Sequence, residues 1–323
     1  MNREQTFIDW FGRSLEIEDC DPSLYMSKYF FDRFEYNEEQ RLWITWIYGT
    51  TYYWPTAYVV WNEFPDMDLV GVDRLTDWNN SNYSRLRYQT DTKWNKGHLA
   101  EQFASYKEFV ADRTQYEALT QGFVGEPIAD FYTLWETVNG FHKFGRYSSW
   151  FYIQALKQTC DMPIDVDSLW FHDHSGSRSH RNGMCYAVGK PEWIDQKLEE
   201  KQVDFLEAKG REMLAETKRL YPDVADKADF FAMETALCSF KKLFRRKHGR
   251  YLGYYLDRQA EEIKKVEADG WDGIDWKPLW DARNETVDKS FLISIIDPTL
   301  YNIYLDTGDF EPADRSSLEA FFA

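Results

Sequence analysis

Apolar residues recur at helical spacing along most of this chain, which predicts amphipathic helices. The segment Asn37–Gln40 combines a capping residue with a Gln three positions later, the pattern of a helix start. It leads into Leu42, Trp43, Trp46 and Ile47, and we expect this helix to end at Gly49. Pro55 suits the first turn of the next helix, which Pro65 should stop.

Residues 131–138 and 147–156 repeat the helical pattern on either side of a break at 140–145, so they predict a helical hairpin. Further helices are expected over Trp193–Leu220, Ala225–Lys247, Asp257–Ala268 and Lys277–Thr286. Because period-two strands are scarce, we predict a mainly α fold with few or no strands. Since no repeat or linker interrupts it, we expect one helical domain over residues 1–323, with 1–125 as a candidate N-terminal subdomain and 126–290 as the core motif region.

Composition narrows the class of protein. The chain has 323 residues, is 43% hydrophobic and carries 14 Trp, 21 Tyr and 23 Phe, which fill a core or offer stacking surfaces. Its net charge of -17 argues against charge-driven nucleic-acid binding over the whole surface, although a local basic cleft stays open. No apolar run is long enough to span a bilayer and no signal peptide is visible, so we expect a cytoplasmic, unprocessed protein without a membrane partner.

The Cys and His residues give no metal signal. Cys20, Cys160, Cys185 and Cys238 lie far apart, so we expect reduced packing residues. His172 and His174 flank Asp173 at a spacing that suits a metal on a strand, but no further ligand is evident, and we predict no metal site.

Two regions gather cations in this acidic chain. The segment Trp170–Gly183 combines small and hydroxylated residues with Arg178, Arg181, His174 and His180, which is typical of an anion-binding loop; a solvated turn is the alternative. Further upstream, basic residues alternate with Tyr83, Tyr88 and Trp94 and predict either a solvated face or a groove that follows a nucleic-acid backbone. These basic residues are Arg85, Arg87, Lys93, Lys96 and His98.

Three separated segments resemble one superfamily: F-x-x-F-G-x-Y at Phe141–Tyr147, S-G-S-R-S-H-R-N-G-M at Ser175–Met184, and M-E-T-A-L-C-S-F-K-K at Met233–Lys242. Together they resemble the phage α-glutamyl/putrescinyl thymine pyrophosphorylases, also called amino acid:DNA transferases, and the related helical domain of 5-hydroxymethyluracil DNA kinases. The resemblance spans roughly residues 130–255. Because the chain lacks a G-x-x-x-x-G-K-[ST] phosphate-binding loop, the transferase branch fits better.

The chain also departs from the family pattern. Lys143 stands where Gly is common and His174 replaces a Pro-like position. Ser239 and Lys241 replace an expected Glu and Asp, so the role of those two acids does not carry over.

The resemblance implies a reaction on DNA. A kinase first pyrophosphorylates 5-hydroxymethyluracil in the duplex, and the transferase then lets an amino acid or another amine displace pyrophosphate. The implied partners are therefore double-stranded DNA carrying modified thymine, an amine substrate and a hydroxymethyluracil DNA kinase, in the cytoplasm of a phage host. No cofactor is certain; Mg²⁺ suits a pyrophosphate leaving group, although no carboxylate cage is visible.

Such a site needs cations for the leaving group, a proton acceptor and a pocket for an extruded base. The candidates for pyrophosphate are Ser175, Ser177, Arg178, Arg181, Lys241 and Lys242. The candidate proton acceptors are Asp165, Asp173 and Glu234, with a buried salt bridge as the alternative for Glu234. The candidates for DNA contact are Arg85, Arg87, Lys93, Lys96, Lys143, Arg146 and Tyr147.

A second resemblance is to helix-hairpin-helix DNA glycosylases, in which a hairpin holds DNA phosphate and an Asp about 20 residues later enters the base pocket. Gly145 and Asp165 have this spacing, Asp167 competes for the role, and the usual double-Gly hairpin is incomplete. Two rival functions therefore stay open: a non-catalytic DNA-binding module and a glycosylase-like enzyme that excises bases.

Overall fold

The computed structural model of the chain describes residues 3–89, 92–172, 178–242 and 252–286. These residues form fourteen α-helices joined by turns and short 3-10 segments, and they contain no β-strand. The mainly α prediction is therefore confirmed for the described chain. None of the helices described has the length and apolar character needed to cross a lipid bilayer.

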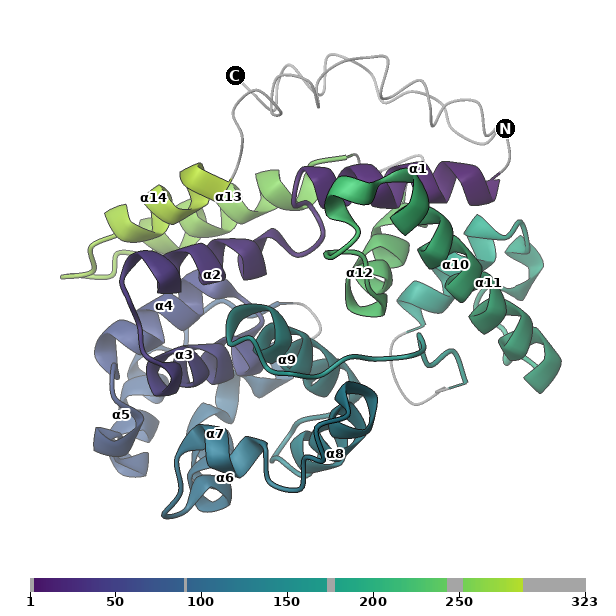
Figure 1. Ribbon diagram of the computed structural model, residues 1–323. Helices are drawn as coiled ribbons and strands as arrows, with labels where there is room; N and C mark the ends of the chain where they lie inside the picture. The colour runs from purple at the N-terminus through teal and green to yellow at the C-terminus, as the bar shows by residue number, and fades with distance from the viewer. Residues whose placement is uncertain (1–2, 90–91, 173–177, 243–251, 287–323) are drawn as a thin grey trace. The chain divides into compact units, whose positions relative to one another are not determined.

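The described residues group into two compact units. The first unit takes the chain up to Pro22 and the described part of Asp167–Asp257; the second takes Ser23–Val166 and Arg258–Thr286. The helices of the first unit are α1 (Arg3–Glu16), α10 (Ser179–Ala187), α11 (Glu200–Leu220) and α12 (Phe230–Phe240). The second unit holds α2 (Pro22–Arg33), α3 (Glu38–Thr51), α4 (Trp54–Glu63), α5 (Val72–Asn82), α6 (Leu99–Val110), α7 (Gln115–Leu119), α8 (Pro127–Asn139), α9 (Arg146–Thr159), most of α13 (Tyr254–Ala268) and α14 (Lys277–Thr286) (Figure 1).

In the first unit, α1 packs against α10, α11 and α12. The Phe7 ring stacks on Phe11 at 5.9 Å and meets the edge of Phe240 at 5.2 Å. Beyond α1, the Asp19 carboxylate accepts hydrogen bonds from the backbone N–H groups of Gly253, Tyr255 and Leu256. It thereby caps the first turn of α13, where the helix leaves backbone donors without an internal partner.

In the second unit, α3 packs along α9 and α4. The predicted helix end at Gly49 is wrong, because α3 continues to Thr51. A Cβ atom at Gly49 would lie 2.7 Å from Cδ2 of Tyr152 on α9, so this glycine permits close helix packing instead of ending the helix.

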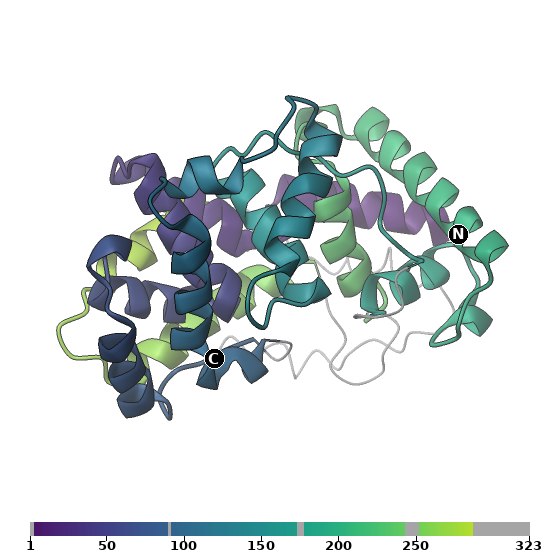
Figure 2. The ribbon, with the colours of Figure 1, turned by 90° about the horizontal axis from the view of Figure 1, so that it is seen from below.

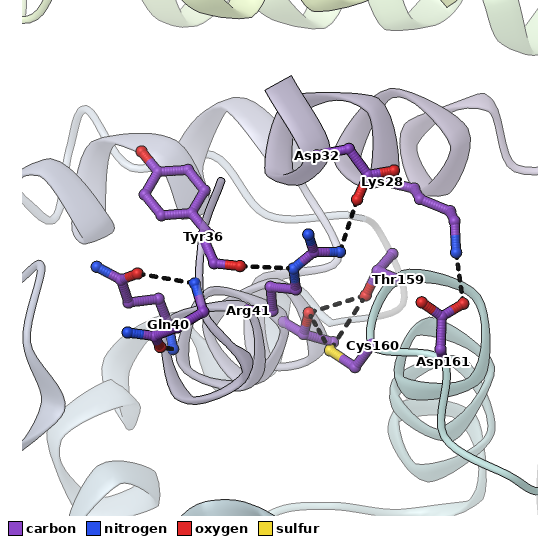
Figure 3. Close-up of polar contacts among 10 residues, drawn as sticks. Lys28, Asp32, Tyr36, Gln40, Arg41, Thr159, Cys160 and Asp161 are labelled. Atoms are coloured by element: carbon purple, nitrogen blue, oxygen red, sulfur yellow. Dashed lines mark hydrogen bonds and ion pairs between the residues drawn. The ribbon is translucent and has the colours of Figure 1, made fainter. Parts of the chain in front are cut away.

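Polar contacts also join α2, α3 and α9 (Figure 3). Arg41 on α3 pairs with Asp32 at 2.8 Å and donates from Nε to the Tyr36 carbonyl at 2.9 Å. Lys28 on α2 pairs with Asp161, which follows α9. These contacts hold the ends of the helices whose apolar faces form the core of the second unit.

The predicted hairpin at 131–156 is confirmed: α8 and α9 pack against each other across the turn at 140–145 (Figures 1 and 2). The helices at Asp257–Ala268 and Lys277–Thr286 are also confirmed, as α13 and α14. The long helix predicted from Trp193 begins later, at Glu200, because Glu199 and Gln202 form a capping box at that point. The helix predicted over Ala225–Lys247 is α12, which Asp229 caps at its start; residues 243–247 lie outside the described residues.

Candidate functional site

The first unit brings two of the motif segments together. Helix α10 carries the end of the Ser175–Met184 segment, α12 carries most of Met233–Lys242, and the two helices pack side by side. Gly183 makes this approach possible, because a Cβ atom there would lie 2.1 Å from the Leu237 carbonyl oxygen of α12. A glycine therefore sets the distance between the two motif segments.

A buried pair of ionisable groups links the two helices. The Nδ1 atom of His180 on α10 lies 3.2 Å from the Glu234 carboxylate on α12, and both side chains are only 2% exposed. The His180 Nε2 atom lies 3.0 Å from the Leu169 carbonyl oxygen. Since a carbonyl oxygen only accepts, Nε2 carries the proton of this hydrogen bond.

Helices α10 and α11 hold the segment Leu169–Phe171, which precedes residues 173–177. Glu207 of α11 accepts hydrogen bonds from the backbone N–H groups of Leu169 (3.2 Å) and Phe171 (2.8 Å). Arg181, which is buried, donates from Nη1 to the Phe171 carbonyl at 3.1 Å. The guanidinium of Arg181 thus serves an interior contact in this structure.

Positive charge gathers at the N-terminus of α10. Arg178 occupies the capping position and is exposed, with its guanidinium donating to the Asp195 carbonyl at 2.9 Å. The Lys241 ammonium, from the end of α12, donates to the Ser179 hydroxyl. The backbone N–H groups of a helix N-terminus favour anions, so two cations and the helix end attract negative charge to one place. Lys242 follows directly and is half-buried.

The remaining predicted residues of the reaction are placed as follows. Asp173, Ser175 and Ser177 lie outside the described residues. Asp165 lies in the second unit, where its carboxylate pairs with Lys157 at 2.9 Å and accepts from the backbone N–H of Val166. Of the described carboxylates that the sequence singled out, Glu234 and Asp167 lie in the same unit as the cations of α10 and α12, and Glu234 belongs to α12 itself.

The residues predicted to contact DNA lie in the second unit, where Arg85 and Arg87 have internal partners. Arg87 forms a two-point ion pair with Asp269, with distances of 2.5 and 2.7 Å. Arg85 donates to the Gly270 carbonyl at 2.7 Å and lies over the Trp271 ring. Both guanidinium groups therefore hold the turn after α13.

Lys93 and Lys96, two of the lysines predicted to contact DNA, lie on exposed aromatic rings. The Lys93 ammonium is 4.8 Å from the Trp94 ring centre, and that of Lys96 is 4.4 Å from the ring of Tyr83. Trp94 is 75% exposed and Tyr83 is 48% exposed, which is unusual for such large rings. Exposed rings beside ammonium groups are the combination that binds nucleic-acid bases and phosphates.

The turn between α8 and α9 presents three more of the predicted residues. Lys143 is exposed and adopts a left-handed backbone conformation (φ 60°), which glycine adopts more readily. Arg146 is buried with its guanidinium over Trp150, and the Tyr147 ring packs on Tyr52 and Phe151. Of the three, Lys143 extends furthest into solvent.

Sequence reasoning missed the pairing of His180 with Glu234, which are 54 positions apart. It treated His180 as a phosphate donor, because no local spacing shows that a histidine on one helix faces a carboxylate on another. It also missed Lys241 at the Ser179 hydroxyl for the same reason.

Comparison with known proteins identifies relatives of this chain. A family model described as "Amino acid:DNA transferase" matches residues 21–248. The chain is 27% identical over 260 residues to a protein named serinyltransferase from Salmonella phage ViI. That match covers 76% of this chain and 63% of the relative, so the chain spans less than two thirds of the relative's length. No solved structure matches the chain.

Proposed function

This chain belongs to the amino acid:DNA transferase family, and we propose that it joins an amino acid or a related amine to pyrophosphorylated 5-hydroxymethyluracil in DNA. The amine nitrogen forms a bond to the exocyclic carbon, the carbon–oxygen bond to pyrophosphate breaks, and the nitrogen loses one proton. The products are the aminated base, pyrophosphate and a proton. Because the phage relative is named a serinyltransferase, serine is the first amine to test.

One observation carries this proposal: cations and a helix N-terminus converge where the motif segments meet. We assign the departing pyrophosphate to the N-terminus of α10, with Arg178, Lys241 and Lys242 as charge partners. Donors fixed in advance stabilise the charge that develops on a leaving group without reorganising during the reaction. Arg181, which is buried, holds the preceding segment in position.

For the amine proton we propose the Glu234–His180 pair. The His180 Nδ1 atom lies 3.2 Å from the Glu234 carboxylate, so a proton taken up by either group stays close to the other. Asp173, which the sequence also nominates, is the competing acceptor.

Glu234→Gln tests this assignment because the amide keeps the shape of the side chain but takes up no proton. We expect pyrophosphate release to slow. A variant that loses stability but keeps the wild-type rate of release would assign Glu234 a purely structural role. The same measurement on Asp173→Asn separates the two candidates.

For DNA we propose that the second unit supplies the contacts. Lys93, Lys96 and the exposed Trp94 ring fit phosphates and an unstacked base. Lys143 and the N-terminus of α9 form the counterpart of a phosphate-binding hairpin, as in the glycosylase-like arrangement. We also propose that the target base leaves the duplex to react, as it does in other enzymes that modify bases in DNA.

We further propose that a hydroxymethyluracil DNA kinase supplies the substrate, since the pyrophosphate group must be installed first. Mg²⁺ often accompanies a pyrophosphate group, so we assign any Mg²⁺ to the substrate and no step of the reaction to it.

The decisive experiment incubates the protein with pyrophosphorylated hydroxymethyluracil DNA and serine, then with other amino acids. Pyrophosphate release is measured together with the mass of the digested nucleosides. If transfer occurs, one pyrophosphate is released for each modified base. The digested DNA then contains a nucleoside with the mass expected when the amine has replaced the pyrophosphate group. Abasic DNA would indicate a glycosylase, and binding without any release would indicate a DNA-binding module; either result rejects the transferase proposal.

A further inference from the structure

Two histidines and a glutamate converge in the second unit, and none of the three is assigned above to the reaction. His98 stands at the capping position of α6, Glu101 lies in its first turn, and His142 lies in the turn between α8 and α9. One ligand atom from each residue lies within 4.8 Å of the others. Both imidazoles contact the same carboxylate oxygen, Oε2 of Glu101.

Local backbone geometry and packing bring these three side chains together. The capping residue and the third residue of a helix face the same side, so His98 and Glu101 meet by local geometry. The turn is attached to α6 by the His142 N–H, which donates to the Ser105 hydroxyl at 3.2 Å. Beside it, the Phe141 ring packs on Tyr106 and Phe109 of α6, with ring centres 5.6 and 5.0 Å apart.

The separation of His142 and Glu101 suits a small divalent ion. Zinc binds imidazole nitrogen and carboxylate oxygen at about 2.0–2.2 Å, so two tetrahedral ligands are separated by roughly 3.3 Å. The His142 Nε2 atom lies 3.5 Å from Glu101 Oε2. The ligand set of two imidazoles and one carboxylate favours transition metals over Mg²⁺ or Ca²⁺, which prefer oxygen alone. All three side chains reach solvent, so further coordination positions are accessible.

We propose that His98, Glu101 and His142 form a binding site for one divalent transition-metal ion of the zinc type. The ion ties the start of α6 to the α8–α9 turn, two segments 44 positions apart. His98 directly follows the segment with Lys93 and Lys96, and His142 directly precedes Lys143. The metal therefore fixes the spacing between two segments to which the proposed function assigns DNA contacts, although its binding does not depend on that function.

The test uses the full chain, freed of metal by chelation and dialysed. Zn²⁺ is titrated in competition with a chromogenic chelator, and bound zinc is counted by elemental analysis. We expect one tightly bound ion per chain. His98→Ala and His142→Ala should each weaken binding at least tenfold, because each removes a ligand. Glu101→Gln should weaken it because it removes the negative charge.

His172→Ala is the matched control, since His172 is an exposed histidine of the other unit. It should leave the zinc affinity unchanged. A Co²⁺ titration adds a direct signature: d–d absorption bands that depend on His98 and His142. Circular dichroism verifies that each variant is folded.

Wild-type affinity in both histidine variants, or no saturable zinc binding by the wild-type chain, would overturn the proposal. The assay contains neither DNA nor amine. Absence of zinc binding would therefore not contradict the transferase proposal. Absence of amine transfer would likewise not contradict the metal site.

Discussion

The replacement of Gly183 by Ala tests whether close packing of α10 on α12 builds the candidate site. The new Cβ atom would lie 2.1 Å from the Leu237 carbonyl oxygen and 2.6 Å from its carbonyl carbon. That is about 1 Å closer than van der Waals contact allows. The obstructing atoms belong to the backbone of α12, so no side chain can rotate away, and the helices must separate.

The size of the effect follows from two opposing terms. Inserting a methyl group into a packed interior costs about 1–3 kcal/mol, and a clash with backbone belongs at the upper end. Alanine in a helix gains about 1 kcal/mol over glycine. We therefore expect the free energy of unfolding to fall by about 2 kcal/mol, measured by urea denaturation. Pyrophosphate release should fall as well, because His180 and Arg178 move away from Glu234 and Lys241.

Gly210→Ala is the control in the same unit. Its Cβ atom would meet Leu169 Cδ1 at 3.2 Å and Met184 Cε at 3.4 Å, the mobile ends of side chains. The gain in helix propensity should offset this contact, leaving stability within about 1 kcal/mol of wild type. Equal stability of the Gly183→Ala and Gly210→Ala proteins would refute the reasoning that backbone contact at Gly183 sets the helix spacing.

Four further predictions concern charge, stacking, pH and thiol reactivity. Arg178→Ala should slow pyrophosphate release on the order of a hundredfold in single-turnover assays, whereas Lys218→Ala, an exposed lysine of α11, should not. Trp94→Ala should weaken binding of single-stranded DNA by about 1–3 kcal/mol in fluorescence anisotropy, and an unchanged affinity would exclude stacking on this ring. Burial raises the pKa of Glu262 above its usual 4.5, so the folded state holds that proton to higher pH than the unfolded state. The free energy of unfolding should therefore decrease as pH rises above 4.5 through the folded pKa, and Glu262→Gln should remove this decrease. Burial also raises the pKa of Cys185 to about 11, so its thiol should react slowly with a disulfide reagent at pH 8; rapid labelling, located by mass spectrometry, would contradict the packing of α10.

Signals within one or two helical turns could be predicted from the sequence. The capping box at Asn37–Gln40, the α8–α9 hairpin and α14 all follow from local patterns and are present. The family resemblance also depended on short segments, and the family model matches the chain around them. Such features depend on backbone propensities and on capping groups that neighbouring residues supply, so a short stretch of sequence is enough to determine them.

Contacts between distant residues required the tertiary structure. Glycine commonly ends helices, yet Gly49 lies inside α3. There it leaves room for Tyr152 of α9, which packs against it. The sequence offered Glu234 as a base or a salt-bridge partner, and only the packing of α10 on α12 placed His180 against it. The convergence of His98, Glu101 and His142 likewise depends on the turn that Phe141 anchors to α6. Helical periodicity specifies which face of a helix is apolar, whereas the partner of each buried polar group is decided when two such faces meet.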